Sequence, residues 1–424
     1  MRSFAAAGGA LLVFGAARAA AQVPPTPAAD GPLRVFVDCE ECDFDHFRRE
    51  VGFVDYVRDR AVAQVHVLVT SQDTGGGGTE HTFFFIGQQQ FAGRQDTLRW
   101  IAPQRASDEE EREGMTRTFA LGLVPFAART DAGRDLSVRY DPERAATAPA
   151  SPARDPWNLW VFRTRLGGSV EGESRSSSVS LDGSLAASRT TDDIKIDFGA
   201  SLDYSEDRFE LRDSTTFVST TRDWEFEGVV VWSIGTHWSA GISTDLRSET
   251  RLNHDFAATA APALEYSLYP YSESTRRQIT VLYTVGPSFF DYEEITLFDQ
   301  LRESRLEQEL EVSAEFQQPW GEVDGSVEWS NFLSDFALHR IEFNGGLEVR
   351  LFQGLNLDLR GNVARIKNQI YVPREDIPDE EILLRRRELG TDFEYELELG
   401  VSFTFGSVFN NVVNPRLTRG GDFR

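Results

Sequence analysis

The sequence predicts a mainly β protein: an antiparallel transmembrane β-barrel of about twelve strands, preceded by a small α/β (α+β) domain. Apolar and charged residues alternate from Trp157 to Phe405, in segments of roughly 10 to 16 residues that are long enough to cross a bilayer at a tilt. In the last segment, Glu394, Glu396 and Glu398 share one face and large apolar side chains share the other, because successive side chains of a strand alternate in direction. An amino-terminal export signal agrees with a location in the outer membrane of a Gram-negative bacterium.

The chain begins with the features of a secretory signal peptide, which we place at residues 1–21. Arg2 supplies a positive charge, a short apolar segment follows, and Ala19-Ala20-Ala21 forms a cleavage site before Gln22. Residues 22–33 are rich in proline and alanine, so we expect them to form a linker.

Residues 34–140 are expected to form a periplasmic α/β domain. Its first half is predicted to contain a strand at 34–38 and a helix at 43–62, whose apolar residues recur near helical spacing. Three further strands and a second helix follow. The strands are placed at 65–70, 80–86 and 95–101, and the helix runs from its cap Ser107 to Ala128.

The two cysteines of the chain, Cys39 and Cys42, follow the first strand and open the first helix. A C-x-x-C at this position is typical of thioredoxin-like redox sites, where the start of a helix lowers the thiol pKa. The neighbouring acids Asp38, Glu40 and Glu41 oppose this effect, so the pattern favours a structural disulfide. A redox-active pair is the alternative, and a zinc site would need ligands that the nearby sequence does not supply.

Residues 141–156 form a second linker rich in proline and alanine, residues 157–406 form the barrel, and residues 407–424 form a carboxy-terminal tail. Short turns and longer loops alternate along the barrel, as on the periplasmic and outer rims of outer-membrane barrels. Five tight turns, with both chain ends on the same rim, give about twelve strands; the turns are at 190–192, 235–236, 269–275, 318–319 and 352–354. The longer connections are predicted near 174–177, 205–221, 249–253, 291–303, 334–337 and 372–390.

When the apolar side chains are assigned to lipid, the other face of each strand points into the lumen and carries many more acids than bases. The principal lumen acids are Glu307, Glu309, Glu311, Glu322, Asp324, Glu328, Glu394, Glu396 and Glu398, and the lumen bases are Arg340, Arg350 and Arg360. One interpretation is a path or binding site that prefers cations. The alternative is a hydrated set of salt bridges, in which the acids of residues 307–311 face Arg340 and Arg350 on neighbouring strands.

The formal net charge of −25 argues against a nucleic-acid partner, because phosphate binding needs a basic surface. Enzyme activity is not expected, since no Gly-x-Ser-x-Gly motif is present. The candidates for an outer-membrane hydrolase are limited to His339 with Ser330 or Ser334, and to His254 beside Asp255. No cofactor and no metal ion is expected.

Five segments resemble an uncharacterised family of Gram-negative outer-membrane β-barrel proteins with an amino-terminal periplasmic α/β domain. They are CEECDFDHFRREVGFVDYVRDR, TGGGGTEHTFFFIG, YPYSESTRRQ, QQPWG and VSFTFGSVFNNVVNPR, and the resemblance covers nearly the whole mature chain. It implies the two-part organisation but no activity and no site residues. More weakly, the small domain is similar to α/β domains of periplasmic assembly proteins in the Tol and curli systems, which implies only a fold.

Together these features predict an outer-membrane channel or transporter for small solutes, with a preference for cations. The alternative is a structural or envelope-assembly factor whose periplasmic domain docks a partner and whose barrel is an anchor. The expected partners are outer-membrane lipids, the barrel-insertion machinery and a periplasmic protein bound through residues 34–140.

Overall fold

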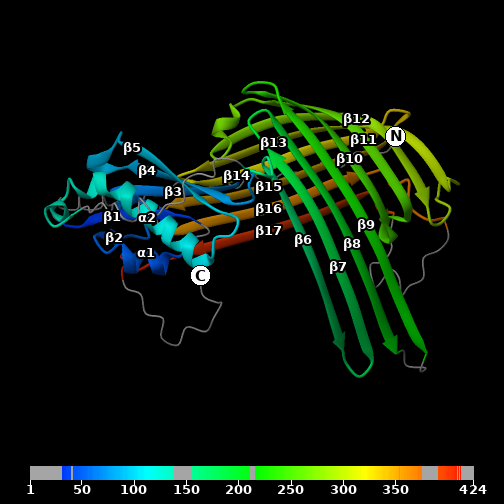
Figure 1. Cartoon of the computed structure of the whole chain (residues 1–424), viewed down its shortest axis with the longest axis horizontal. Coiled ribbons are helices and arrows are strands. Elements are labelled where there is room, and N and C mark those ends of the chain that lie inside the picture. Colours follow the sequence, from blue (N-terminus) through cyan, green and yellow to red (C-terminus); the bar gives the residue numbers. More distant parts are fainter. Residues whose placement is uncertain are drawn as a thin grey trace, which may run out of the picture.

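The structure of the chain, a computed structural model, describes residues 31–39, 42–137, 155–210, 215–352, 354–374 and 390–407, together with residues 409 and 411. The expected signal peptide and most of both linkers and of the tail lie outside the described residues. The described part contains a five-stranded sheet with two α-helices and a twelve-stranded antiparallel sheet (Figure 1). None of its helices is long and apolar enough to cross a bilayer.

The five-stranded sheet has the order β2-β1-β3-β4-β5, in which β1 pairs in parallel with β2 and β3, and the remaining pairs are antiparallel. Its strands are β1 (Leu33–Asp38), β2 (Val54–Tyr56), β3 (Val65–Asp73), β4 (Thr79–Gly87) and β5 (Gln95–Ala102). The helices are α1 (Phe44–Glu50) and α2 (Asp108–Ala127), with short 3-10 turns at Arg60–Val62, Gln89–Phe91 and Asp131–Arg134. We call this part the small domain; its α/β character and four predicted strands are confirmed.

Helix α2 packs on the sheet of the small domain and contributes much of its core. Phe119 of the helix is fully buried in the same cluster as Phe85 of β4. Gly122 permits this close approach, since a Cβ atom there would collide with the Phe85 ring. Ser107 caps the helix as predicted, in a capping box with Glu110 that satisfies backbone N–H groups at the helix start.

The predicted helix at residues 43–62 is wrong beyond its first two turns. Helix α1 ends at Glu50, and the segment that follows Gly52 forms the edge strand β2, which pairs in parallel with β1. Glycine disfavours the helix interior, and buried residues alternate with a half-buried one in β2, which suits a strand. The apolar spacing that suggested one helix therefore comes from two elements that pack on the same core.

The large sheet contains twelve strands in sequence order, each antiparallel to its neighbours, as predicted. The strands are β6 (Trp160–Gly172), β7 (Ser176–Thr190), β8 (Ile194–Glu210), β9 (Thr216–Ser233), β10 (Trp238–Glu249), β11 (His254–Ser267), β12 (Arg277–Tyr292), β13 (Arg302–Gln318), β14 (Gly321–Phe332), β15 (Asp335–Phe352), β16 (Leu355–Ile366) and β17 (Phe393–Phe403). The five tight turns lie where they were predicted, and we call the rim that they form the tight-turn rim.

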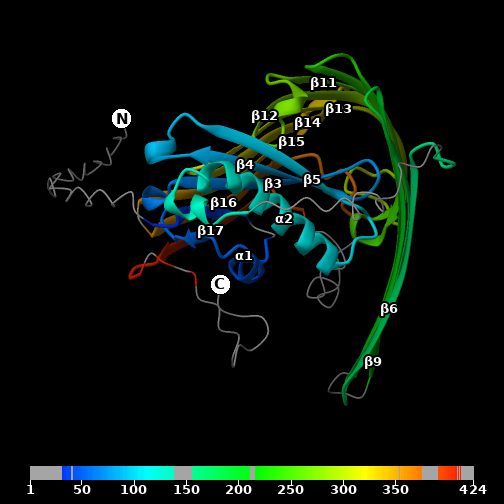
Figure 2. The same cartoon turned by 60° about the vertical axis from the view of Figure 1, so that its left-hand side comes forward.

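The large sheet is curved but not closed into a barrel. Within the described residues, β6 and β17 are its two edges and are not paired with each other. Figure 2 shows β6 to β9 turning away from the edge formed by β17, with the small domain lying on the concave side of the sheet. The closure implied by the sequence prediction is therefore not observed for the described strands.

Three of the predicted longer connections are shorter in the structure. β7 begins soon after β6 ends, β15 begins directly after the turn that follows β14, and β8 continues to Glu210 within the predicted loop 205–221. The hairpin ladders continue through these polar segments; Ser176, for example, pairs with Phe209. Polar strand ends resemble loops in composition, which explains the error.

Candidate functional site

The two faces of the large sheet differ in chemistry, as the alternation predicts. We call the concave face, which carries Glu311 and Glu328, the inner face. The outer face exposes large apolar side chains on every strand: Leu166, Leu181, Leu202, Trp224, Ile242, Leu264, Val281, Leu306, Val327, Phe343, Val363 and Leu397 are examples. An exposed apolar surface of this extent is typical of a membrane or protein interface.

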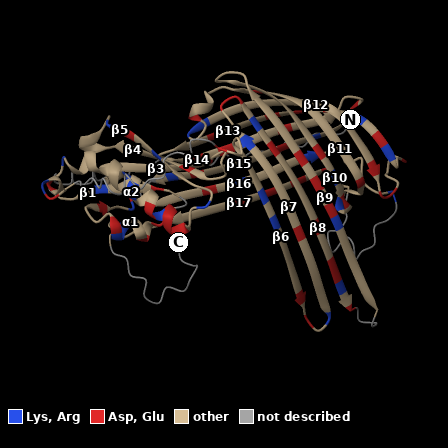
Figure 3. Cartoon of the chain, in the orientation of Figure 1, with Lys and Arg blue, Asp and Glu red and all other residues tan. Residues whose placement is uncertain are grey.

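The strand register places all the predicted lumen residues on the inner face. Glu311 of β13 lies directly opposite Glu328 of β14, which lies opposite Glu342 of β15. Charged positions recur along these strands (Figure 3). The other predicted residues on this face are Glu307, Glu309, Glu322, Asp324, Arg340, Arg350, Arg360, Glu394, Glu396 and Glu398.

Several of these carboxylates face other carboxylates. Besides the row of Glu311, Glu328 and Glu342, a second row follows: Glu322 lies opposite Glu348, which lies opposite Asp358. Directly opposed side chains have Cβ atoms about 5 Å apart, and like charges in such pairs destabilise a sheet by about 0.2–1 kcal/mol. The inner face therefore concentrates negative charge, which attracts cations.

Two of the predicted lumen bases neutralise only part of this charge. Arg340 Nη2 lies 2.6 Å from a carboxylate oxygen of Glu342 and 3.5 Å from one of Glu394. Arg360 Nε lies 3.8 Å from Asp358. Both bases thus lie beside acids of the inner face.

The salt bridges predicted between residues 307–311 and Arg340 or Arg350 are wrong. Strand β14 separates β13 from β15, so these side chains do not lie on adjacent strands. Glu307 instead accepts a hydrogen bond of 2.9 Å from Ser288. Within the described residues, no hydrogen bond or ion pair engages the carboxylates of Glu309 or Glu311.

Acids outnumber bases among the charged residues that line two cavities along the inner face. The first has a volume of about 540 Å³, and its charged lining residues are Glu322, Asp324, Glu348, Asp358, Glu396, Glu398 and Arg360. The second has a volume of about 560 Å³, and its charged lining residues are Glu225, Glu227, Asp245, Glu265, Glu307, Glu309 and Arg247. The sequence indicated that these strands carry inward acids. Only the structure shows that the acids gather around two cavities.

The tightest acidic group of the second cavity consists of Glu225, Glu227 and Asp245. One carboxylate oxygen from each lies within 4.8 Å of the others, a spacing that suits a cation with oxygen ligands. Arg247 Nε lies 3.7 Å from Asp245 and competes for the same carboxylate. This group is therefore better suited to brief contact with a mobile cation than to a tightly held metal ion.

At the rim opposite the tight turns, an apolar cluster covers the inner face. Phe290 of β12 and Phe332 of β14 are buried together with Ile370, which belongs to the segment after β16. The Leu297 amide in the β12–β13 loop donates a hydrogen bond of 2.8 Å to the Val372 carbonyl of the same segment. This inward-folded segment covers part of the inner face beyond the acidic cavities.

Arg350, the third predicted lumen base, joins the large sheet to the small domain. Its Nη1 and Nη2 atoms donate to both carboxylate oxygens of Asp38, at the end of β1, over 2.6 and 2.5 Å. Its guanidinium also lies 5.5 Å from the centre of the Phe36 ring. Bidentate ion pairs between arginine and a carboxylate are strong and directional. The side chain therefore contributes to a junction between the two sheets.

Asp38 is supported from within the small domain by His66, which is fully buried in β3. His66 Nε2 lies 3.3 Å from Asp38 Oδ2. Burial lowers the pKa of the His66 imidazole, so the ring is neutral at pH 7. Burial raises the pKa of the Asp38 carboxyl, but contacts with His66 and Arg350 outweigh that effect and hold it below its usual range. The junction therefore presents an ionised carboxylate to Arg350.

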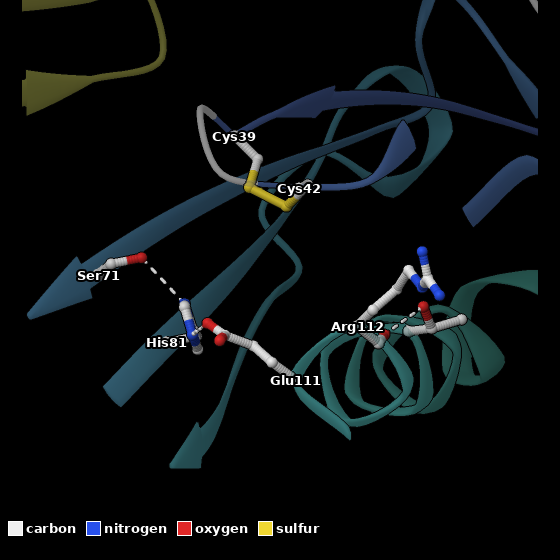
Figure 4. The surroundings of a disulfide bond; sticks show 7 residues. Cys39, Cys42, Ser71, His81, Glu111 and Arg112 are labelled. Atoms are coloured by element: carbon white, nitrogen blue, oxygen red, sulfur yellow. Dashed lines mark hydrogen bonds and ion pairs between the residues drawn. A yellow bond between two sulfur atoms is a disulfide. The ribbon is translucent and has the colours of Figure 1, made fainter. Parts of the chain in front are cut away.

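Cys39 and Cys42 form a disulfide at the entry to α1, as predicted (Figure 4). Asp43 caps α1, and its side chain also pairs with Arg112 of α2 at 3.1 Å. The disulfide and this ion pair connect the start of α1 to the strand before it and to the second helix.

A second feature in Figure 4 was not predicted. Ser71 Oγ lies 2.9 Å from His81 Nδ1, and His81 Nε2 lies 2.9 Å from Glu111 Oε1 on α2. The His81 ring is fully buried and stacks on Trp100, so these contacts satisfy both of its nitrogens and hold α2 on the sheet. The three residues lie on three different elements, and their spacing gave no signal.

The fold does not bring Ser330 and His339 to the same face of the sheet. Ser330 lies opposite Arg340 on the inner face. His339 directly precedes Arg340 on β15, so its side chain points to the outer face. His254 stacks on the Phe290 ring.

Comparisons with known proteins give distant structural likenesses only. No family model matches the chain, and no curated protein matches it in sequence. Among solved structures, the NanC porin is 8% identical with a TM-score of 0.28, over 58% of this chain and 99% of that chain. The β-domain of the Bordetella autotransporter BrkA is 11% identical with a TM-score of 0.26, over 58% and 98%. The translocator domain of the autotransporter NalP from Neisseria meningitidis is 11% identical with a TM-score of 0.25, over 58% and 87%.

Proposed function

We propose that the chain is an outer-membrane β-barrel channel for small cations, with the small domain on the periplasmic side. The observation that carries this proposal is the inner face, where carboxylates lie opposite carboxylates in rows and each of two cavities has six acids and one base. The apolar outer face supports the placement in lipid, and strands of 11 to 18 residues are long enough to span it.

Closure of the sheet in a membrane follows from the chemistry of its edges. Lipid cannot satisfy the backbone N–H and C=O groups of an open edge, so β6 and β17 must be paired. The two strands run in opposite directions, and their inner-face charges are complementary, with Arg163 and Arg165 on β6 and Glu396 and Glu398 on β17. We infer an antiparallel seam in which these four side chains face each other.

Conductance of the purified full-length chain in planar bilayers tests the channel function. In a gradient of potassium chloride, we expect a reversal potential that shows preference for potassium over chloride. Replacing Glu309, Glu311 and Glu328 by glutamine should reduce this preference, whereas Glu113→Gln on the exposed face of α2 should not change it. Anion preference, or no conductance in any variant of the chain, would contradict the proposal.

A second candidate function is docking of an envelope protein through the small domain. The observation that favours it is the outer edge of β5, which has no neighbouring strand within the described residues and could accept one from a partner. Crosslinked pull-down with the full chain tests this function. Thr97→Pro on this edge should abolish the specific binding of a partner, because proline cannot donate a hydrogen bond to an added strand.

A further inference from the structure

The small domain contacts the tight-turn rim at widely separated strands. On one side, Arg350 of β15 holds Asp38, as described above. Next to β12, the Arg276 guanidinium lies 5.0 Å from the centre of the Phe84 ring of β4. A domain that hung freely from its linker would not need contacts with several strands of one rim.

The β3–β4 hairpin of the small domain extends these contacts toward the other edge of the large sheet. Its tip contains Gly75 and Gly77. A Cβ atom at Gly75 would collide with Thr190, the last residue of β7, and one at Gly77 would lie 2.9 Å from Arg163 Nη2 on β6. Small residues at the tip thus allow the hairpin to lie directly against β6 and the end of β7.

The segment after β17 adds a third attachment. Phe409 forms an antiparallel bridge with Val57, next to the edge strand β2. The Asn411 side chain accepts a hydrogen bond of 2.6 Å from the Tyr56 amide and donates one of 2.7 Å to Asp55. The chain that leaves the last strand of the large sheet therefore pairs with the sheet of the small domain.

The junction is polar, whereas each part has an apolar core of its own. The hydrophobic cluster of the small domain includes no residue of the large sheet, and the cluster at the opposite rim includes no residue of the small domain. Interfaces held by an ion pair, ring contacts, one β-bridge and a few hydrogen bonds, without a shared core, resemble those between domains that move. The contacts therefore suit a domain that is seated on the rim and can leave it.

We propose that the small domain is a gate seated on the tight-turn rim by the Asp38–Arg350 pair, and that its displacement opens the acid-lined path to small cations. This inference rests on the proposed channel function. Arg350 is the central contact because its side chain lies among acids of the inner face but pairs with Asp38, an acid of the small domain.

Charge reversal at the junction tests the gate. Arg350→Asp opposes Asp38 with a like charge, and the double variant Asp38→Arg with Arg350→Asp restores the pair with its polarity exchanged. Arg117→Asp, on the exposed face of α2, is the matched control. In planar bilayers, we expect Arg350→Asp to raise the open probability about tenfold or more. The reason is that losing hydrogen bonds between charged groups shifts an equilibrium by a factor of that order. The double variant should return it toward that of the unmodified chain.

A distance measurement separates failure of the gate from failure of the channel. Spin labels at Thr97→Cys on β5 and Thr236→Cys in the β9–β10 turn report the position of the small domain relative to the rim. Under the proposal, Arg350→Asp lengthens and broadens this distance and the double variant restores it. Unchanged distances and open probability in a conducting protein would overturn the gate alone. A lengthened distance without conductance in any variant would overturn the channel function on which the gate depends.

Discussion

Glu328 is the residue whose replacement best tests the like-charge rows of the inner face. It is flanked by Glu311 on β13 and Glu342 on β15. Each opposed pair of like charges destabilises a sheet by about 0.2–1 kcal/mol, so the two pairs together amount to about 0.4–2 kcal/mol. Arg340 neutralises part of the Glu342 charge, so Glu328→Gln should stabilise the fold by about 1 kcal/mol.

Thermal unfolding in detergent measures this gain. In a domain of this size, about 1 kcal/mol corresponds to a rise in Tm of about 2–4 °C. Scans at one fixed rate make variants comparable where unfolding is irreversible. The rise should be present at 10 mM salt and largely lost at 1 M salt, where the Debye length is about 3 Å.

Glu171→Gln is the matched control, because Glu171 faces Ser178 and has no acid opposite it. It should leave the Tm unchanged at either salt concentration. A lower Tm for Glu328→Gln at low salt, or an equal shift at both concentrations, would refute the reasoning. Either result would mean that repulsion from Glu311 and Glu342 is not the dominant effect at Glu328.

Three further predictions concern the small domain, each measured by hydrogen exchange of its core strands in the full-length chain. Ser107→Ala removes the capping box and should lower stability by about 1 kcal/mol; no change would contradict a role for the cap. Replacing Cys39 and Cys42 by serine should cost about 2 kcal/mol from loop closure, and reduction of the unmodified chain should match it. The pKa of His66 is lower in the folded state, so the unfolded chain takes up the proton first. Stability should therefore fall as the pH drops below the usual value of 6.5, and a flat profile between pH 7 and 5 would contradict this.

The faces of the strands were predictable because they depend only on the local alternation of side chains. The position of Glu394, Glu396 and Glu398 on one face follows from a period of two, whatever strand lies next to them. Tight turns were also predictable, since residues such as Gly235, with a positive φ, carry their own conformational signal.

Contacts across strands were not predictable, because they depend on register and on long-range packing. The sequence could not show that Glu328 lies between two other acids, nor that Ser71, His81 and Glu111 would meet. The edge strand β2 was missed for a related reason. It is held by pairing with β1, and its own residues are compatible with helical spacing.

Arg350 links the two proposals and leads to a last prediction. While the small domain is seated, the charges of Arg350 and Asp38 cancel at the rim. When the domain leaves, Asp38 leaves with it, and Arg350 is released about 7 Å along β15 from Glu348, on the same face. The open mouth is then less negative than the deeper row around Glu328. Glu348→Gln should therefore reduce the cation preference of the open state less than Glu328→Gln does. Reversal potentials measure both effects, in the chain that retains Arg350 and in the Arg350→Ala variant.

A larger effect at Glu348 than at Glu328 in the chain that retains Arg350 would place the selective position at the mouth and refute this argument.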